Sequence, residues 1–259
     1  MKKFFTTERG KIGALDVFTV KSNALGNRAD LSVFKPTGDF TNMPIVILLH
    51  GVYGSHWAWS LKANVHQTLK SMIANQQVEP MLLVMPSDGL FHDGSGYLKH
   101  HNADYEKWIV EDVISIVKDN YKEVSDASPV FLAGLSMGGY GALRLGAKYP
   151  NVFKAFSGLS SIIRFDQMGQ FVENFDLLKQ AIESEENVID IMLAHKASLK
   201  PFRFDCGKED TLFEANQILD KQLNEHNIPH EFLIKEGAHS WEYWRDNIGE
   251  TLLFFNEQI

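Results

Sequence analysis

Continuous apolar runs are the clearest pattern along this chain. Residues 44–49 and 81–85 are apolar at every position, and the runs are followed by His50-Gly51 and Pro86. Because strand side chains alternate between two faces, such runs predict strands buried on both faces of a sheet. Other apolar or alternating segments predict further strands at 15–22, 28–34, 129–133, 152–159, 201–206 and 229–235.

Helical periodicity fills the intervals between these strands. Residues 105–120 place apolar side chains on one face, and helices are also predicted at 60–76, 139–148, 210–226 and 241–255. Strands that alternate with helices predict an α/β fold, a mostly parallel sheet with helices on both faces. We expect a single domain over residues 1–259, with the less regular segment 162–198 as an insertion over the active-site edge. Helical stretches are expected in this segment at 175–184 and 188–195.

A Gly-x-Ser-x-Gly sequence follows directly behind the predicted strand 129–133. Gly134 and Gly138 lie two residues before and two residues after Ser136. In a nucleophile elbow the strand-to-helix turn is so sharp that glycine is needed beside the serine. The strand before the motif and the helix-like segment after it are the context this turn requires, so Ser136 is the candidate nucleophile. The alternative is a solvent-exposed serine on an ordinary tight turn.

A serine hydroxyl needs a general base, which is normally a histidine. Four histidines follow Ser136. His195 and His226 fall within or at the end of predicted helices, and His230 opens a predicted strand. Only His239 lies in a loop after a strand, at the edge of the sheet where the elbow opens. His239 is therefore the candidate base.

An acid that orients this histidine should lie in another loop after a strand, between the serine and the histidine. Asp210 ends the loop behind the predicted strand 201–206. Capping the next helix is its alternative role, and the two roles are compatible. Glu209 is the second choice, whereas Asp205 lies within the strand.

A tetrahedral intermediate needs two N–H donors for its oxyanion. The backbone N–H of Met137, directly after the serine, is one candidate. The loop after strand 44–49 should supply the other, with Val52 as the first choice and Tyr53 as the second. We expect His50 in this loop to form structural hydrogen bonds rather than to act as a base.

Aromatic side chains flank these loops. Most aromatics in such positions pack in the core, but an acyl or aryl pocket needs apolar walls. We expect Tyr53, Trp57 and Trp241 to contribute to substrate binding.

Charge and composition narrow the function classes. A net charge of −8 and the lack of a basic run argue against nucleic-acid binding. Cys206 is the single cysteine, so no intrachain disulfide is possible, and we expect it to be a small buried residue. No apolar stretch approaches the roughly 18 residues that span a membrane. The first ten residues lack the apolar core of a signal peptide, so a cytoplasmic protein is expected unless a leader has been removed.

Histidines and aspartates between residues 92 and 104 are candidate metal ligands. Their spacing matches no standard site. We expect neither a metal nor another cofactor. The residues concerned are His92, Asp93, His100, His101 and Asp104.

Several segments together resemble one family of α/β-hydrolases, the esterases that include esterase D (S-formylglutathione hydrolase) and the feruloyl, acetyl-xylan, tributyrin and enterochelin esterases. The resemblance runs from about Ser22 to the C-terminus, and the segments are Ile47–Gly51, Val84–Pro86, Gly134–Leu143, Cys206–Asp210 and His239–Trp244. It implies an α/β-hydrolase fold, a triad of Ser136, Asp210 and His239, and oxyanion donors at Val52 and Met137. The closing His-x-Trp-x-x-Trp is similar to the feruloyl, acetyl-xylan and enterochelin branches, whereas S-formylglutathione hydrolases usually carry a different segment there.

These observations predict a serine carboxylic-ester hydrolase that acts through an acyl-enzyme on a small acyl or aryl ester, such as a short-chain, acetyl or feruloyl ester. The expected partner is therefore a small-molecule ester. An S-formylglutathione-type thioesterase or an acyltransferase is the alternative with the same residues, and an inactive binding protein on a hydrolase fold is the alternative of another class. The acyl group, the alcohol and the formation of a homo-oligomer are left open.

Overall fold

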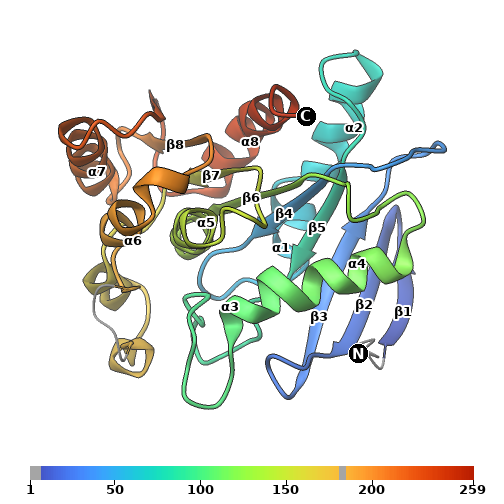
Figure 1. The fold of residues 1–259 in the computed structure, drawn as a ribbon, viewed down its shortest axis with the longest axis horizontal. Coiled ribbons are helices and arrows are strands. Elements are labelled where there is room, and N and C mark those ends of the chain that lie inside the picture. Colours follow the sequence, from blue (N-terminus) through green and yellow to red (C-terminus); the bar gives the residue numbers. More distant parts are fainter. Residues whose placement is uncertain (1–6, 181–184) are drawn as a thin grey trace.

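The computed structural model describes residues 7–180 and 185–259. Across these residues, nine strands form one sheet in the order β1-β2-β3-β5-β4-β6-β7-β8-β9 (Figure 1). All neighbours from β5 to β9 run parallel, whereas β1, β2, β3 and β5 pair antiparallel. The predicted mostly parallel sheet is confirmed. The strands are β1 (Thr7–Ile12), β2 (Leu15–Lys21), β3 (Arg28–Phe34), β4 (Ile45–Leu49), β5 (Leu82–Pro86), β6 (Val130–Leu135), β7 (Ala155–Leu159), β8 (Phe202–Gly207) and β9 (Glu231–Lys235).

Helices cover both faces of this sheet, as the alternation of elements predicts (Figure 1). On one face lie α1 (Ala58–Lys62), α2 (Val65–Ala74) and α8 (Trp241–Asn256). On the other lie α3 (Tyr105–Lys107), η1 (Trp108–Val113), α4 (Ile114–Asn120), α5 (Met137–Lys148), α6 (Val188–Ala194) and α7 (Phe213–Glu225).

The central strand β4 is buried on both faces. Ile45, Ile47 and Leu49 belong to the core beneath α4 and α5, while Val46 and Leu48 belong to the core beneath α2 and α8. The two cores follow from the period-2 alternation of side chains along a strand. β4 lies between β5 and β6, so its C-terminal end opens beside the end of β6. Ligands of open parallel sheets bind at this edge.

Three elements differ from those expected. The predicted helix 60–76 is two helices, because Asn64 takes a left-handed backbone conformation (φ 51°) between α1 and α2. The exposed edge strand β1 was not predicted, since its mostly polar residues carry no apolar signature and pair with β2 through the backbone. The predicted helix 105–120 forms, but η1 in its middle is π-helical.

Segment 162–198 is mostly irregular, and its residues 181–184 lie outside the described part of the chain. It contains the 3₁₀ turns η2 (Phe165–Gln170), η3 (Phe175–Leu178) and η5 (Lys196–Ser198), together with α6. The helical stretch expected at 175–184 is thus a 3₁₀ turn as far as it is described, whereas the one at 188–195 forms as α6. Figure 1 shows α6 beside α5 and α7.

Helix α5 packs so closely on β7 that its Gly146 has no room for a side chain. A β-carbon there would overlap the ring of Phe156. Gly249 in α8 is the matched case, because a β-carbon there would meet Met72 Sδ at an ordinary contact distance of 3.7 Å.

Gly146→Ala should therefore destabilise the protein by about 1–3 kcal/mol through overpacking. Gly249→Ala should stabilise it by about 0.5–1 kcal/mol, because alanine has the higher helix propensity. Urea unfolding followed by circular dichroism measures both changes. Equal effects of the two substitutions would contradict the close packing of α5 on β7.

Candidate active site

Ser136 lies at the turn between β6 and α5 with a strained backbone, φ 54° and ψ −118°. A β-carbon on Gly134 would overlap Gly138 O, and one on Gly138 would overlap Leu49 O. The two glycines of the motif are thus required by backbone packing, as the sequence predicts. The serine is almost fully buried and stands at the N-terminus of α5.

His239 and Asp210 complete a hydrogen-bonded chain with this serine. His239 Nε2 lies 3.0 Å from Ser136 Oγ, and His239 Nδ1 lies 2.9 Å from Asp210 Oδ2. The Asp210 carboxylate is fully buried, whereas the imidazole is 19% exposed. Since a carboxylate accepts, Nδ1 carries the proton and Nε2 is free to accept the serine proton. The structure brings together the three residues that the sequence predicts for this role.

The loops after β8 and β9 are held together by their backbones. A β-carbon on Gly207 would overlap Gly237 O, and Gly237 itself has a positive φ of 126°. Glu209 N donates to Gly237 O at 3.1 Å, and Glu209 Oε2 accepts from Gly237 N at 2.6 Å. Glu209, the second choice for the acid, therefore anchors the histidine loop instead. Asp210 does not cap α7 directly, because Leu212 is the N-cap, but its Oδ1 accepts from Leu212 N at 2.8 Å.

The two first-choice oxyanion donors have free N–H groups. Within the described residues, no acceptor receives the N–H of Val52 or of Met137. The second choice, Tyr53, is engaged, since its N–H donates to Asp93 O at 3.1 Å. Gly94 lies against both donor residues, because a β-carbon there would overlap Met137 Sδ and come within 3.4 Å of Val52 Cγ1.

Two aromatic rings enclose His239. Phe171 stacks on the imidazole with ring centroids 5.5 Å apart, and Trp244 packs edge-on against it at 4.9 Å. Phe171 belongs to segment 162–198 and was not predicted, because no motif or periodicity marks a residue that reaches the site from an irregular segment. Glu173 N, two residues further on, donates to Asp93 Oδ2 at 2.9 Å, so this segment also contacts the loop beside the oxyanion donors.

The three expected substrate-binding aromatics have different surroundings. Tyr53 is 68% exposed and Trp57 is 38% exposed, which leaves both available at the surface beside the oxyanion loop. Trp241 is half-buried and packs edge-on against Trp59 and Trp244. Trp241 is therefore supported by core aromatics on two sides.

The other sequence candidates lie elsewhere. His230 binds Asp220, with its Nε2 2.9 Å from Oδ1, and His195 and His226 occupy helix C-caps. Asp205 accepts from Tyr243 and Arg203, and burial raises its pKa to about 6 despite those partners.

Cys206 is fully buried, as predicted. Burial, with the nearby Asp210 and Asp205 carboxylates, raises the pKa of its thiol. A protonated buried thiol is neither a nucleophile nor a metal ligand. Among the described residues, no three histidine, cysteine or acidic side chains gather as a metal would require.

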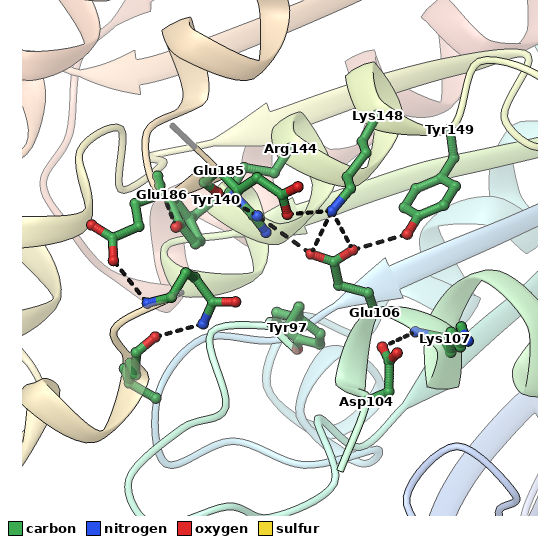
Figure 2. A network of polar contacts seen from close by, with 12 residues as sticks. Tyr97, Asp104, Glu106, Lys107, Tyr140, Arg144, Lys148, Tyr149, Glu185 and Glu186 are labelled. Atoms are coloured by element: carbon green, nitrogen blue, oxygen red, sulfur yellow. Dashed lines mark hydrogen bonds and ion pairs between the residues drawn. The ribbon is translucent and has the colours of Figure 1, made fainter. Parts of the chain in front are cut away.

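Helix α5 also carries a buried ion pair with Glu106 (Figure 2). Arg144 Nη2 lies 3.3 Å from Glu106 Oε1, Lys148 Nζ lies 3.0 Å from Oε2, and Tyr149 donates to Oε2 at 2.9 Å. Burial would raise the pKa of the Glu106 carboxyl, but Arg144 and Lys148 more than offset it and hold the pKa below its ordinary 4.5. Glu106 is 3% exposed, and with its pKa lowered the carboxylate stays charged at neutral pH.

The same helix holds residues 185 and 186 of segment 162–198 (Figure 2). Arg144 Nε donates to Glu185 O at 2.9 Å, and the Tyr140 hydroxyl donates to Glu186 O. Lys148 Nζ contacts the Glu185 carboxylate at 2.6 Å. One helix thus begins at the candidate nucleophile and binds the backbone of residues 185 and 186, in the same segment as Phe171.

The fold and this serine–histidine–aspartate arrangement define an α/β-hydrolase. A ferulic acid esterase of known structure superimposes with a TM-score of 0.83 at 22% identity, over 99% of this chain and 100% of that one. An S-formylglutathione hydrolase from Staphylococcus aureus superimposes with a TM-score of 0.75 at 18% identity, over 97% and 99%. At such low identity the two likenesses establish the fold.

Sequence comparison defines the family. The family described as "Putative esterase" matches residues 22–255. The acetyl esterase of Caldicellulosiruptor saccharolyticus is 25% identical over 237 residues, which is 84% of this chain and 85% of the relative. The chain belongs to this esterase family and is a carboxylic ester hydrolase. No helix in the described residues has the length and apolarity needed to cross a membrane.

The buried Glu106 pair makes a pH-dependent prediction. The pKa of the Glu106 carboxyl is lower in the folded protein than in the unfolded chain, so the unfolded chain binds more protons in acid. The stability that this ion pair contributes is therefore lost as the pH falls below about 4.5. Glu106→Gln should lower the free energy of unfolding by about 3 kcal/mol at pH 7, because Arg144 loses its buried partner. The difference from wild type should shrink as the pH falls toward 4 and below.

Glu185→Gln is the matched control. It removes only a half-exposed ion pair with Lys148 and keeps the backbone carbonyl that Arg144 binds. Its cost should stay below about 1 kcal/mol at either pH. Urea titrations at pH 7 and pH 4 measure the free energy of unfolding of both variants. A cost of Glu106→Gln that does not change with pH would contradict the conclusion that Glu106 is the charged, buried partner of Arg144.

Proposed function

We propose that this esterase is a serine hydrolase that cleaves short-chain acyl esters, acetyl esters first, through an acyl-enzyme. The observation that carries the proposal is the hydrogen-bonded chain from Ser136 through His239 to Asp210, at 3.0 and 2.9 Å. Such a chain is the arrangement that activates a hydroxyl at neutral pH. The residues occur in the chain order that α/β-hydrolases use.

Acylation begins when Ser136 Oγ attacks the ester carbonyl carbon and its proton passes to His239 Nε2. The buried Asp210 carboxylate stabilises the resulting imidazolium, because charges interact strongly where water is excluded. The oxyanion receives the N–H groups of Val52 and Met137. The intermediate then collapses, and His239 returns the proton to the departing alcohol oxygen.

Deacylation repeats these steps with water. His239 Nε2 takes a proton from a water molecule, whose oxygen attacks the acyl carbon of the Ser136 ester. The second tetrahedral intermediate releases the carboxylic acid and returns the proton to Ser136 Oγ. The reaction uses protein groups and water, and it requires neither metal nor cofactor.

The acetyl esterase likeness supports a short acyl group, because that relative matches along most of both chains. A second candidate, an aryl ester such as a feruloyl ester, is favoured by the aromatic side chains around the site. Phe171 covers His239, and Tyr53 and Trp57 are exposed beside the oxyanion loop. Thioester hydrolysis and acyl transfer would use the same three residues.

Ser136→Ala should lower kcat by roughly 10⁴- to 10⁶-fold, because the covalent step is removed while substrate binding remains. Hydrolysis of p-nitrophenyl acetate measures the loss. Ser157→Ala is the matched control, since its buried hydroxyl lies on the neighbouring strand β7 and pairs with Thr251. It should retain wild-type kcat.

A fluorophosphonate probe tests the covalent step independently. Wild-type protein and Ser157→Ala should be labelled, whereas Ser136→Ala should not. An unlabelled wild-type protein without esterase activity would favour an inactive binding protein on a hydrolase fold. Wild-type turnover by Ser136→Ala would rule out the serine mechanism.

The acyl preference is tested by kcat/KM on p-nitrophenyl acetate, p-nitrophenyl butyrate, methyl ferulate and S-formylglutathione. We expect the acetyl ester to be preferred over methyl ferulate and the thioester. A marked preference for methyl ferulate would identify the aryl ester as the substrate class instead. Added alcohols that raise the yield of transferred ester would indicate an acyltransferase.

A further inference from the structure

We infer that His50 is a positioning residue that holds the Gly51–Val52 peptide so that the Val52 N–H faces the oxyanion. The inference rests on the proposed function, because it takes the Val52 N–H as an oxyanion donor. His50 would act through this peptide and not on the substrate itself.

The carbonyl of the peptide is anchored on both of its acceptor positions. Gly51 O accepts from His50 Nδ1 at 2.7 Å and from Gly54 N at 3.2 Å. A peptide is planar and trans, so its C=O and N–H point in opposite directions. Anchoring Gly51 O therefore sets the direction of the Val52 N–H, which has no acceptor of its own in the described residues.

The protonation state of His50 follows from its second partner. Asp88 N donates to His50 Nε2 at 2.9 Å, and a backbone N–H can only donate. Nε2 is therefore unprotonated, and Nδ1 carries the hydrogen that it gives to Gly51 O. Both ring nitrogens are engaged, which excludes His50 as the general base.

Close packing confines the imidazole. His50 is 1% exposed, and a β-carbon on Gly54 would come within 2.6 Å of its Nδ1. The Tyr97 ring packs edge-on against it at 6.1 Å. The Asp88 carboxylate in turn accepts from the N–H groups of Leu90 and Ser95, so the loop that presents Asp88 N is itself held.

A hydrogen bond accepted by the carbonyl also polarises the peptide. Inside a protein such chains of hydrogen bonds strengthen one another, so the Val52 N–H becomes a better donor. Donors that are oriented before the reaction cost no reorganisation when the oxyanion forms. The effect of His50 should therefore appear in the transition state and not in substrate binding.

Two variants separate the two hydrogen bonds of His50. His50→Asn keeps an N–H near the position of Nδ1 and loses the acceptor for Asp88 N. His50→Gln places an amide oxygen near the position of Nε2 and loses the donor to Gly51 O. We expect kcat on p-nitrophenyl acetate to fall roughly 10- to 100-fold in His50→Gln with little change in KM, and to stay within about threefold of wild type in His50→Asn.

A tetrahedral mimic gives the second readout. The inhibition constant of an arylboronic acid should weaken in parallel with kcat/KM across the variants, because both depend on the oxyanion donors. Tyr97→Phe is the control for loop stability, since it removes a buried hydrogen bond to His50 O of 2.9 Å. It should lower the Tm and leave kcat and boronate binding unchanged.

Several results would overturn the inference. These are wild-type kcat in His50→Gln, an equal loss of kcat in His50→Asn, or an equal loss in Tyr97→Phe. If the His50 variants fail to fold, long-range ¹⁵N–¹H NMR of the wild-type enzyme decides, and a protonated Nε2 at pH 7 would be incompatible with it. If the wild-type enzyme is active and labelled by the probe but His50→Gln is unimpaired, this inference alone is refuted. If the wild-type protein is inactive and unlabelled, the proposed function is refuted as well.

Discussion

The site depends on one close approach between backbones. Helix α5 begins so near the end of β4 that Gly138 has no space for a β-carbon beside Leu49 O. This contact brings the serine at the end of β6 next to the loop after β4. The candidate nucleophile and the two candidate oxyanion donors, the N–H groups of Met137 and Val52, therefore share one edge of the sheet, because two main chains pack there without side chains between them.

A second backbone contact positions the proposed acid, Asp210, and the proposed base, His239. Gly207 and Gly237 lie against each other where β8 and β9 end, and Glu209 joins the two loops by two hydrogen bonds. Asp210 and His239 are carried on these loops at hydrogen-bonding distance. The rigid parallel strands β8 and β9 thus position the Asp210 and His239 side chains more precisely than flexible loops alone would.

Helix α5 links Ser136 to segment 162–198. Its N-terminus follows the serine, and its buried Arg144 binds Glu106 on one side and the backbone of residue 185 on the other. A buried arginine is costly unless its charge is matched, and here the Glu106 carboxylate matches the charge while Glu185 O accepts from Nε and Nη2. Helix α5 thus holds residues 185 and 186 of segment 162–198, the segment whose Phe171 stacks on His239.

Much of this site could be predicted from the sequence because its signals are local. Gly134, Ser136 and Gly138 mark the elbow through the steric demands of one turn, and continuous apolar runs mark strands buried on both faces. Parallel strands share one C-terminal edge, so loop residues such as Asp210 and His239 were expected to meet there.

Only the tertiary structure decided the contacts that depend on residues far apart in the chain. The stacking of Phe171 on His239, the role of Glu209 in anchoring the histidine loop and the engagement of the Tyr53 N–H by Asp93 have no sequence period or motif. The edge strand β1 likewise forms through backbone pairing with β2, which its polar side chains do not reveal. The sequence by itself determined the alternation of strands and helices and the residues able to do the chemistry. Packing between distant segments determined their distances and their partners, because those free energies come from contacts that exist only once the chain has folded.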